Sequence, residues 1–122
     1  MEEFFREMFA EHEVNGMQYR QIVQDIVTGA RLPDRDIALR SLASLSGTDL
    51  RPLLAVVDRP TLLLHGEEDR ICLPAASRFM AELIPQAHLR VLPGIGHAPF
   101  LSHPAEFNHL VGQFVEGLYA TR

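Results

Sequence analysis

Hydrophobic residues recur at helical spacing in the first part of the chain, up to about residue 48. The apolar positions lie three or four residues apart, as they do on one face of a helix. Three such groups occur, and their members are Phe5, Met8 and Phe9, then Tyr19, Ile22, Val23, Ile26 and Val27, then Ala38, Leu42 and Leu45. We therefore predict that residues 1–48 form an all-helical segment.

The pattern changes in residues 49–122, where short apolar runs alternate with helical stretches. The continuous run Thr61–His65 is typical of a strand that is covered on both faces, as in parallel sheets. A helix is expected to begin at Pro74, a second strand spans about 88–92, and a last helix follows Pro104. Strand, helix, strand and helix in this order predict an α/β fold with two neighbouring parallel strands.

A shorter helix is expected before the first strand. Thr48 or Asp49 is placed to cap it, and its apolar face consists of Leu50, Leu53, Leu54 and Val57. Two parallel strands leave unpaired edges, and parallel sheets normally hold more strands than two. We therefore interpret residues 49–122 as an incomplete α/β core, part of a larger sheet.

Composition narrows the class of protein. The 122 residues are enough for one compact domain, and 47% of them are hydrophobic. Acidic residues outnumber basic ones 16 to 11, so the net charge of −5 argues against nucleic acid as the main partner. The single cysteine, Cys72, excludes an internal disulfide and a multi-cysteine zinc site. No apolar run approaches the length of a membrane-spanning helix, which is about 18 residues. The first residues are acidic, unlike those of a secretion signal. We therefore expect a cytoplasmic protein without a membrane partner.

Two loops follow the two predicted strands, and each holds a residue suited to acid–base chemistry. Asp69 lies in the loop His65–Arg70, and His97 lies in the Gly-rich loop Pro93–Phe100. Parallel strands end at the same edge of a sheet, where open α/β folds place their sites. We therefore expect Asp69 and His97 to meet, and a carboxylate that accepts a hydrogen bond from imidazole fixes the imidazole tautomer and stabilises its protonated form.

At these residues the sequence resembles a known family. The stretches Asp49–Leu53 (DLRPL) and Pro60–Asp69 (PTLLLHGEED) are similar to the approach to the acidic residue of α/β-hydrolases. The stretch Gly96–Phe107 (GHAPFLSHPAEF) resembles their catalytic-histidine segment, particularly that of BioH-type pimeloyl-acyl-carrier-protein methyl ester esterases of biotin synthesis. The resemblance covers about residues 49–119, and residues 1–48 resemble, more loosely, the lid that such enzymes insert before their last strands.

The resemblance implies a carboxylesterase that acts on short acyl esters, including a methyl ester carried on acyl carrier protein. In such an enzyme Asp69 orients His97, which deprotonates a serine and later protonates the leaving alcohol. Ile71 and Ala98, which lie close to this pair in the sequence, are the residues that we expect in the substrate pocket. No cofactor and no metal are expected.

The serine nucleophile is the feature in which this sequence departs from the family pattern. That nucleophile comes before the lid, on a Gly-x-Ser-x-Gly elbow, and the oxyanion loop comes earlier still. The sequence contains no such elbow, and Ser46 in Leu45–Gly47 lacks the preceding strand. We therefore expect the acid and the base of a triad here, with the nucleophile supplied by a missing N-terminal segment or by another chain.

Several other residues have a structural and a functional interpretation. Cys72 could be a nucleophile, but a buried, inert thiol is favoured. His65 is expected to be a packed strand residue. The acidic run Glu67–Asp69 could bind a cation, but one buried acid with two solvated neighbours fits the family better. Three residues at helical spacing weakly indicate a metal site, namely His103, Glu106 and His109. For these residues polar contacts at a helix end are the favoured interpretation.

Two interpretations concern partners. The helical part contains Arg20, Arg31, Arg35 and Arg40. These arginines could dock an acidic, phosphate-bearing acyl carrier protein, although the interpretation as a solvated helix surface is favoured. The rival to an esterase is a non-catalytic, self-associating hydrolase remnant. Its strand 61–65 would offer an open edge to a second copy, giving a homodimer by strand pairing or by helix exchange.

Overall fold

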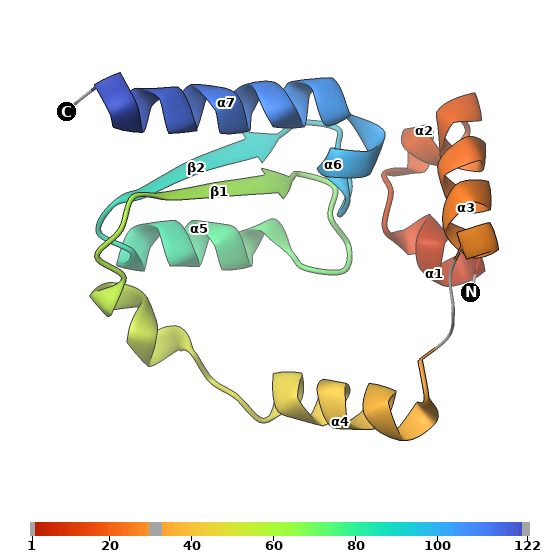
Figure 1. The fold of residues 1–122 in the computed structure, drawn as a ribbon, viewed down its shortest axis with the longest axis horizontal. Helices are drawn as coiled ribbons and strands as arrows, with labels where there is room; N and C mark the ends of the chain where they lie inside the picture. Colours follow the sequence, from red (N-terminus) through yellow and green to blue (C-terminus); the bar gives the residue numbers. More distant parts are fainter. Residues whose placement is uncertain (1, 30–32, 121–122) are drawn as a thin grey trace.

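A computed structural model describes residues 2–29 and 33–120 of the chain (Figure 1). The elements, in chain order, are α1 (Glu2–Glu7), α2 (Glu11–Val14), α3 (Met17–Gly29), α4 (Arg35–Ser46), the 3-10 helix η1 (Arg51–Val56), β1 (Thr61–Gly66), α5 (Pro74–Leu83), β2 (Ala87–Leu92), α6 (Pro99–Ser102) and α7 (Pro104–Ala120). The short helices α2 and α6 were not predicted from the sequence.

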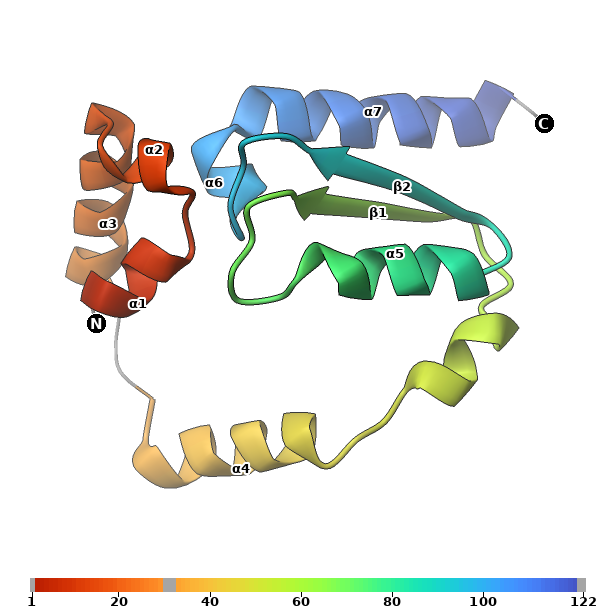
Figure 2. The same ribbon diagram turned by 180° about the vertical axis from the view of Figure 1, so that it is seen from behind.

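The two strands form a parallel sheet between two layers of helix. They pair in register from Thr61 opposite Ala87 to Gly66 opposite Leu92. Helix α5 covers one face of the sheet and α7 the other, as both ribbon views show (Figures 1 and 2). The predicted α/β arrangement, two neighbouring parallel strands with flanking helices, is confirmed. Within the described residues the sheet has these two strands.

Prolines set the bounds of the helices around the sheet. Pro74, Pro99 and Pro104 occupy the first turns of α5, α6 and α7. A first-turn residue has no acceptor for its N–H within the helix, so proline is tolerated there. Pro85 directly follows Ile84, the last residue capping α5, and prevents the helix from continuing. The chain therefore turns back into β2 where the sequence predicted.

Helices α1–α3 stand at the end of the sheet to which both strands point (Figure 1). The first helix was expected to reach Phe9, but it ends at Glu7, and the chain then turns so that Phe9 and Ala10 are buried. The Phe9 ring packs edge-on against Tyr19 of α3, with 5.2 Å between ring centres. This contact packs the turn after α1 against α3.

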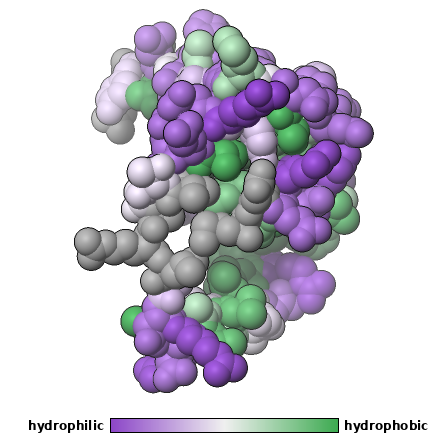
Figure 3. Space-filling model, turned by 90° about the vertical axis from the view of Figure 1, so that its right-hand side faces the viewer, coloured by the Kyte–Doolittle hydropathy of each residue, from purple (hydrophilic) through white to green (hydrophobic). Residues whose placement is uncertain are grey.

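Helix α4 stands apart from the sheet and from α1–α3 in both ribbon views. The Asp34 carboxylate caps it by accepting the N–H groups of Asp36 and Ile37. None of its residues is buried, and the side chains of Leu42 and Leu45 are 61% and 78% exposed. Figure 3 shows apolar atoms along the hollow between this lower part and the rest of the molecule. The apolar side of α4 is therefore uncovered within the described residues.

The helix expected over residues 50–57 is the short 3-10 helix η1. Its N-cap is Leu50, so the expectation of Thr48 or Asp49 at this position is wrong. The Asp49 carboxylate does accept the N–H of Arg51 at 3.0 Å, and it also binds the Arg51 guanidinium at 2.7 Å. These bonds link Asp49, two positions before the helix, to Arg51, its first residue.

Candidate active site

Asp69 and His97 lie side by side just beyond the carboxyl ends of β1 and β2. The Nδ1 atom of His97 is 2.8 Å from Oδ2 of Asp69. Asp69 follows the end of β1 at Gly66, and His97 follows the end of β2 at Leu92. The meeting of these two side chains, expected from the parallel order of the strands, is confirmed.

Glycines allow the two loops to come this close. A Cβ on Gly66 would lie 2.0 Å from the carbonyl oxygen of Gly96 and 2.3 Å from that of Ile95, so no other residue fits here without movement of the backbone. Gly94 has a φ of +70°, a conformation that side-chain-bearing residues rarely adopt. The N–H of Glu68 donates to the carbonyl of Ile95 at 2.9 Å and fastens one loop to the other.

The Asp69 carboxylate is buried, with 5% of the residue exposed, and is well supplied with donors. Its Oδ1 accepts the backbone N–H groups of Ile71 and Cys72, both at 2.9 Å. Burial raises the pKa of Asp69, but the hydrogen bonds from Cys72, His97 and Ile71 together outweigh it and hold this pKa below its usual value. Asp69 is therefore an ionised acceptor at neutral pH.

An ionised Asp69 determines how His97 is protonated. A carboxylate only accepts hydrogen bonds, so the Nδ1 atom of the neutral His97 ring must carry the hydrogen. The lone pair of the neutral ring is then on Nε2, which points away from the Asp69 contact. The His97 side chain is 32% exposed, so the ring is open on one side. This arrangement suits a general base whose acidic neighbour fixes its tautomer.

His65 of β1 contacts the loop that carries Asp69. Its Nε2 lies 2.7 Å from the Cys72 carbonyl oxygen and 3.2 Å from Oδ2 of Asp69, and its Nδ1 contacts the Ser77 hydroxyl. A neutral ring satisfies both neighbours, because Nε2–H donates to Cys72 while Nδ1 accepts from Ser77. The expectation of a packed His65 is confirmed, with its side chain 11% exposed, but its hold on this loop was not predicted.

The N-terminal segment holds the other loop, and this contact was not predicted. The N–H of His97 donates to the carbonyl of Met8 at 2.7 Å, and the N–H of Gly96 donates to Oε2 of Glu13 at 3.2 Å. A Cβ on Gly96 would lie 2.8 Å or less from atoms of Met8, Phe9 and Ala10. The histidine loop is therefore fixed against the start of the chain.

The sequence model of the Alpha/beta hydrolase family matches residues 2–110, and the loops described above lie within this match. The chain belongs to the alpha/beta hydrolase family. The crystal structure of an esterase from Exiguobacterium antarcticum is similar to this chain with a TM-score of 0.77, over 94% of this chain and 41% of that one. The two are 24% identical in sequence, so this likeness concerns the fold alone.

Curated relatives of this chain include pimeloyl-[acyl-carrier protein] methyl ester esterases. That of Nitrosomonas europaea is 44% identical over 66 residues, which are 54% of this chain and 26% of that protein. That of Yersinia pseudotuberculosis is 30% identical over 99 residues, which are 81% of this chain and 38% of that protein. The chain therefore spans about a quarter to two fifths of the length of these relatives.

Three further candidate residues lie in the same two loops, namely Ile71, Cys72 and Ala98. Cys72 is exposed, so the expectation of a buried thiol is wrong. The backbone N–H of Cys72 donates to Asp69 and its carbonyl contacts His65, so the backbone faces these residues and the side chain points outward. Ile71 is 40% exposed beside Asp69, whereas Ala98 is completely buried.

The residues considered for metal binding make other contacts. His103 lies at the junction of α6 and α7, where its Nδ1 is 2.9 Å from the Ser102 hydroxyl and 3.2 Å from Oε1 of Glu13. The expectation of polar contacts at a helix end is confirmed for His103. In the described part of the chain, no three His, Cys, Asp or Glu residues are grouped so that they could hold a metal ion. No helix in that part is long and apolar enough to cross a membrane.

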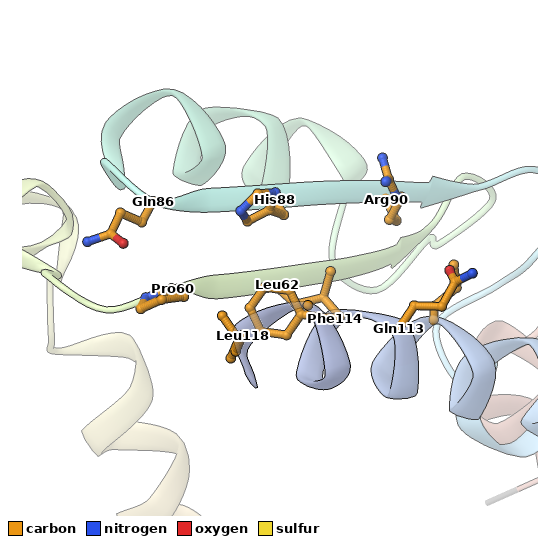
Figure 4. A pocket seen from close by; sticks show the side chains of 10 residues that line it. Pro60, Leu62, Gln86, His88, Arg90, Gln113, Phe114 and Leu118 are labelled. Atoms are coloured by element: carbon orange, nitrogen blue, oxygen red, sulfur yellow. The ribbon is translucent and has the colours of Figure 1, made fainter. Parts of the chain in front are cut away.

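A groove of about 490 Å³ opens elsewhere, between the sheet and α7 (Figure 4). Its walls include Leu62 of β1, His88 and Arg90 of β2, and Phe114 and Leu118 of α7. The His88 and Phe114 rings meet edge to face, 5.7 Å apart. Neither Asp69 nor His97 lines this groove, so it is separate from the acid–base pair.

Proposed function

We propose that this chain carries the acid and the general base of a serine-type carboxylesterase, with Asp69 as the acid and His97 as the base. The observation that carries the proposal is the 2.8 Å contact between Nδ1 of His97 and a buried, ionised Asp69 at the carboxyl ends of parallel strands. In a serine-type triad this pairing holds the base in one tautomer and stabilises it when it is protonated.

The chemistry follows from the tautomer of His97. The Nε2 lone pair takes the hydroxyl proton of a serine as its oxygen attacks the ester carbonyl. Asp69 stabilises the resulting imidazolium, which then gives that proton to the departing alcohol oxygen as the acyl–serine ester forms. Water, deprotonated by the same Nε2, attacks the acyl–serine, and the proton passes back to the serine oxygen as the acid leaves.

The serine in this scheme comes from outside the 122 residues. None of the serines of the sequence lies in a Gly-x-Ser-x-Gly context. Ser41 and Ser46 bond to carbonyls of their own helix, Ser77 contacts His65, and Ser102 contacts His103. We propose that an N-terminal part of the protein, or a second chain, supplies the nucleophile and the oxyanion loop.

The names of the relatives guide the proposed substrate, a short acyl ester such as a methyl ester on acyl carrier protein. We propose residues 1–48 as a lid and 49–122 as the core portion, because α1–α3 stand at the strand ends where substrate would enter (Figure 2). Ile71 and Ala98 stay proposed substrate-pocket residues. For the carrier protein, Arg20, Arg35 and Arg40 are exposed, whereas Arg31 lies outside the described residues.

Complementation tests this proposal. The chain is assayed on a short p-nitrophenyl ester alone and after addition of the N-terminal part of the Nitrosomonas europaea esterase, the part that this chain does not cover. We expect no turnover from the chain alone and turnover from the mixture. Asp69→Asn should lower kcat by about 10⁴-fold, and His97→Ala should abolish turnover, whereas the exposed neighbour Glu68→Gln should change nothing.

Two results would contradict it. Turnover by the mixture that survives His97→Ala would remove His97 from the chemistry. Turnover by the chain alone that is lost in His97→Ala would place a nucleophile inside the 122 residues, against the proposed division of the site.

The open edge of β1 favours a second candidate function, self-association without catalysis. β1 pairs with β2 on one side, and the described residues provide no strand for its other side. An unpaired strand edge favours pairing with another chain. We propose a homodimer formed by strand pairing or helix exchange, and expect sedimentation at micromolar concentration to show a dimer. A stable monomer would contradict this candidate.

A further inference from the structure

We infer that Glu13 is a positioning residue for His97, because its buried carboxylate holds the N–H of the residue that precedes the histidine. The inference rests on the proposed function in one respect only, the role of His97 as the base. It concerns how the N-terminal helices control the proposed active site, which no motif of the sequence indicates.

The Glu13 carboxylate links two separate parts of the chain through one oxygen atom. Its Oε2 accepts the N–H of Ala10 at 2.6 Å, within its own segment, and the N–H of Gly96 at 3.2 Å, in the histidine loop. Its Oε1 lies 3.2 Å from Nδ1 of His103, at the junction of α6 and α7, but makes no hydrogen bond. The Glu13 side chain is only 5% exposed, so water is a poor substitute for the Ala10 and Gly96 N–H groups.

Two neighbouring N–H groups of the histidine loop are bound by the same N-terminal segment. Gly96 donates to the Glu13 side chain, and His97 donates to the Met8 carbonyl at 2.7 Å. Together they fix the peptide planes on both sides of the Gly96 Cα atom. The orientation of these planes determines where the His97 side chain leaves the backbone, and hence whether Nδ1 reaches Asp69.

Loss of the Glu13 carboxylate would leave the Gly96 N–H buried without an acceptor. A buried, unpaired N–H is unfavourable, so the loop would shift to regain a partner. Since Gly96 packs without a Cβ against Met8, Phe9 and Ala10, that shift would also loosen this contact. The predicted result is a weakened contact between His97 and Asp69.

The test reads the His97 tautomer directly from the ¹⁵N chemical shifts of the ring in the intact chain, at a pH where the ring is neutral. The unmodified chain should show the Nδ1–H tautomer. Glu13→Ala should lose this preference, with the Nε2–H form appearing. Glu13→Gln keeps an oxygen within reach of Gly96 and should retain the Nδ1–H form. Glu11→Ala, an exposed acid of the same helix, is the matched control and should change nothing.

Glu13→Asp keeps the charge but has a shorter side chain, which does not reach the N–H of Gly96. This variant tests the inference if Glu13→Ala fails to fold. It should also lose the Nδ1–H preference. The inference is overturned if Glu13→Asp and every folded Glu13→Ala sample keep the tautomer of the unmodified chain. It is overturned equally if Glu13→Gln loses the Nδ1–H form while Glu13→Asp keeps it, because charge rather than the hydrogen bond would then matter.

This readout needs no serine and no substrate, so it stands apart from the esterase assay. Failure of complementation leaves the tautomer result valid, and an unchanged tautomer in Glu13→Ala leaves the esterase proposal intact. Where complementation succeeds, Glu13→Ala should lower kcat by up to about 10²-fold with KM unchanged, because only the base is misplaced. A change in KM alone would contradict a role through His97.

Discussion

Gly66 at the end of β1 lies directly against the carbonyl of Gly96 in the histidine loop, with no space for a side chain between them. A Cβ at position 66 would be 2.0 Å from that carbonyl oxygen. This approach brings the first turn after β1, which carries Asp69, under the loop that carries His97. The sheet thereby determines the geometry of the proposed acid–base pair.

The first prediction concerns this approach. Gly66→Ala forces backbone against backbone, so the free energy of unfolding should fall by about 1–3 kcal/mol or more, measured by denaturant unfolding. Gly112→Ala is the matched control, because a Cβ at position 112 in α7 has nothing within 4 Å. That change should raise the free energy of unfolding by about 0.5–1 kcal/mol. Equal stability of Gly66→Ala and the unmodified chain would refute the close approach.

The second prediction concerns His65 as support for the Asp69 loop. His65→Ala leaves the carbonyl of Cys72 and the hydroxyl of Ser77 without their partner. Ser77 is buried, and a buried, unpaired group costs about 1–3 kcal/mol, so the free energy of unfolding should fall by about 1–3 kcal/mol. His109→Ala, an exposed histidine of α7, should stay within about 0.5 kcal/mol. Similar losses for the two variants would count against the supporting role.

The third prediction is a dependence of stability on pH. The pKa of Asp69 is lowered in the folded chain, so its ionised form contributes stability that is present above the unfolded pKa of about 4. This contribution is lost as the pH falls through the lower, folded pKa. The free energy of unfolding should therefore decrease with falling pH below about 4.

The control for this prediction is Asp49, whose pKa is lowered to about 2 by its hydrogen bonds with Arg51. That pair is exposed and well solvated, so its contribution should be small. In urea unfolding between about pH 4 and pH 2, Asp69→Asn should flatten the pH dependence more than Asp49→Asn does. A steeper slope in Asp69→Asn would contradict the direction of the Asp69 shift.

The meeting of Asp69 and His97 could be predicted because it depends on general properties of the chain. The apolar run before Gly66 and the alternation around β2 indicate strands, and parallel strands end at one edge. Pro74 and Pro104 then mark where the intervening helices begin. The meeting of the two loops therefore follows from the order of the elements, whereas the roles of Asp69 and His97 within them were implied by the resemblance to α/β-hydrolases.

The support for this pair could not be predicted, for a physical reason. Gly96 is held through its backbone N–H, a group that nearly every residue carries, so the Glu13 contact leaves no pattern in the sequence. His65 has the spacing of an ordinary strand residue, and its partner Cys72 binds through a carbonyl. For Cys72 the residue type favoured burial, but the inward use of its backbone determined an outward side chain.

The packing of helix α4 also could not be predicted from the sequence. The spacing of Ala38, Leu42 and Leu45 predicted a helix, and the Asp34 cap fixes where it begins. An apolar stripe indicates that a helix has a side to bury, but not which surface will cover it. In the described residues this stripe is exposed. The local sequence therefore determines the helix, but no packing contact determines what covers its apolar side.

The most direct test of the central claim is the tautomer of His97 in the unmodified chain and in Asp69→Asn, read from ring ¹⁵N shifts at a pH where the ring is neutral. If the two side chains meet as described, the unmodified chain holds its ring hydrogen on Nδ1, and Asp69→Asn shifts it to Nε2. An unmodified chain with the hydrogen on Nε2, or two identical spectra, would contradict the pairing and the esterase site built on it.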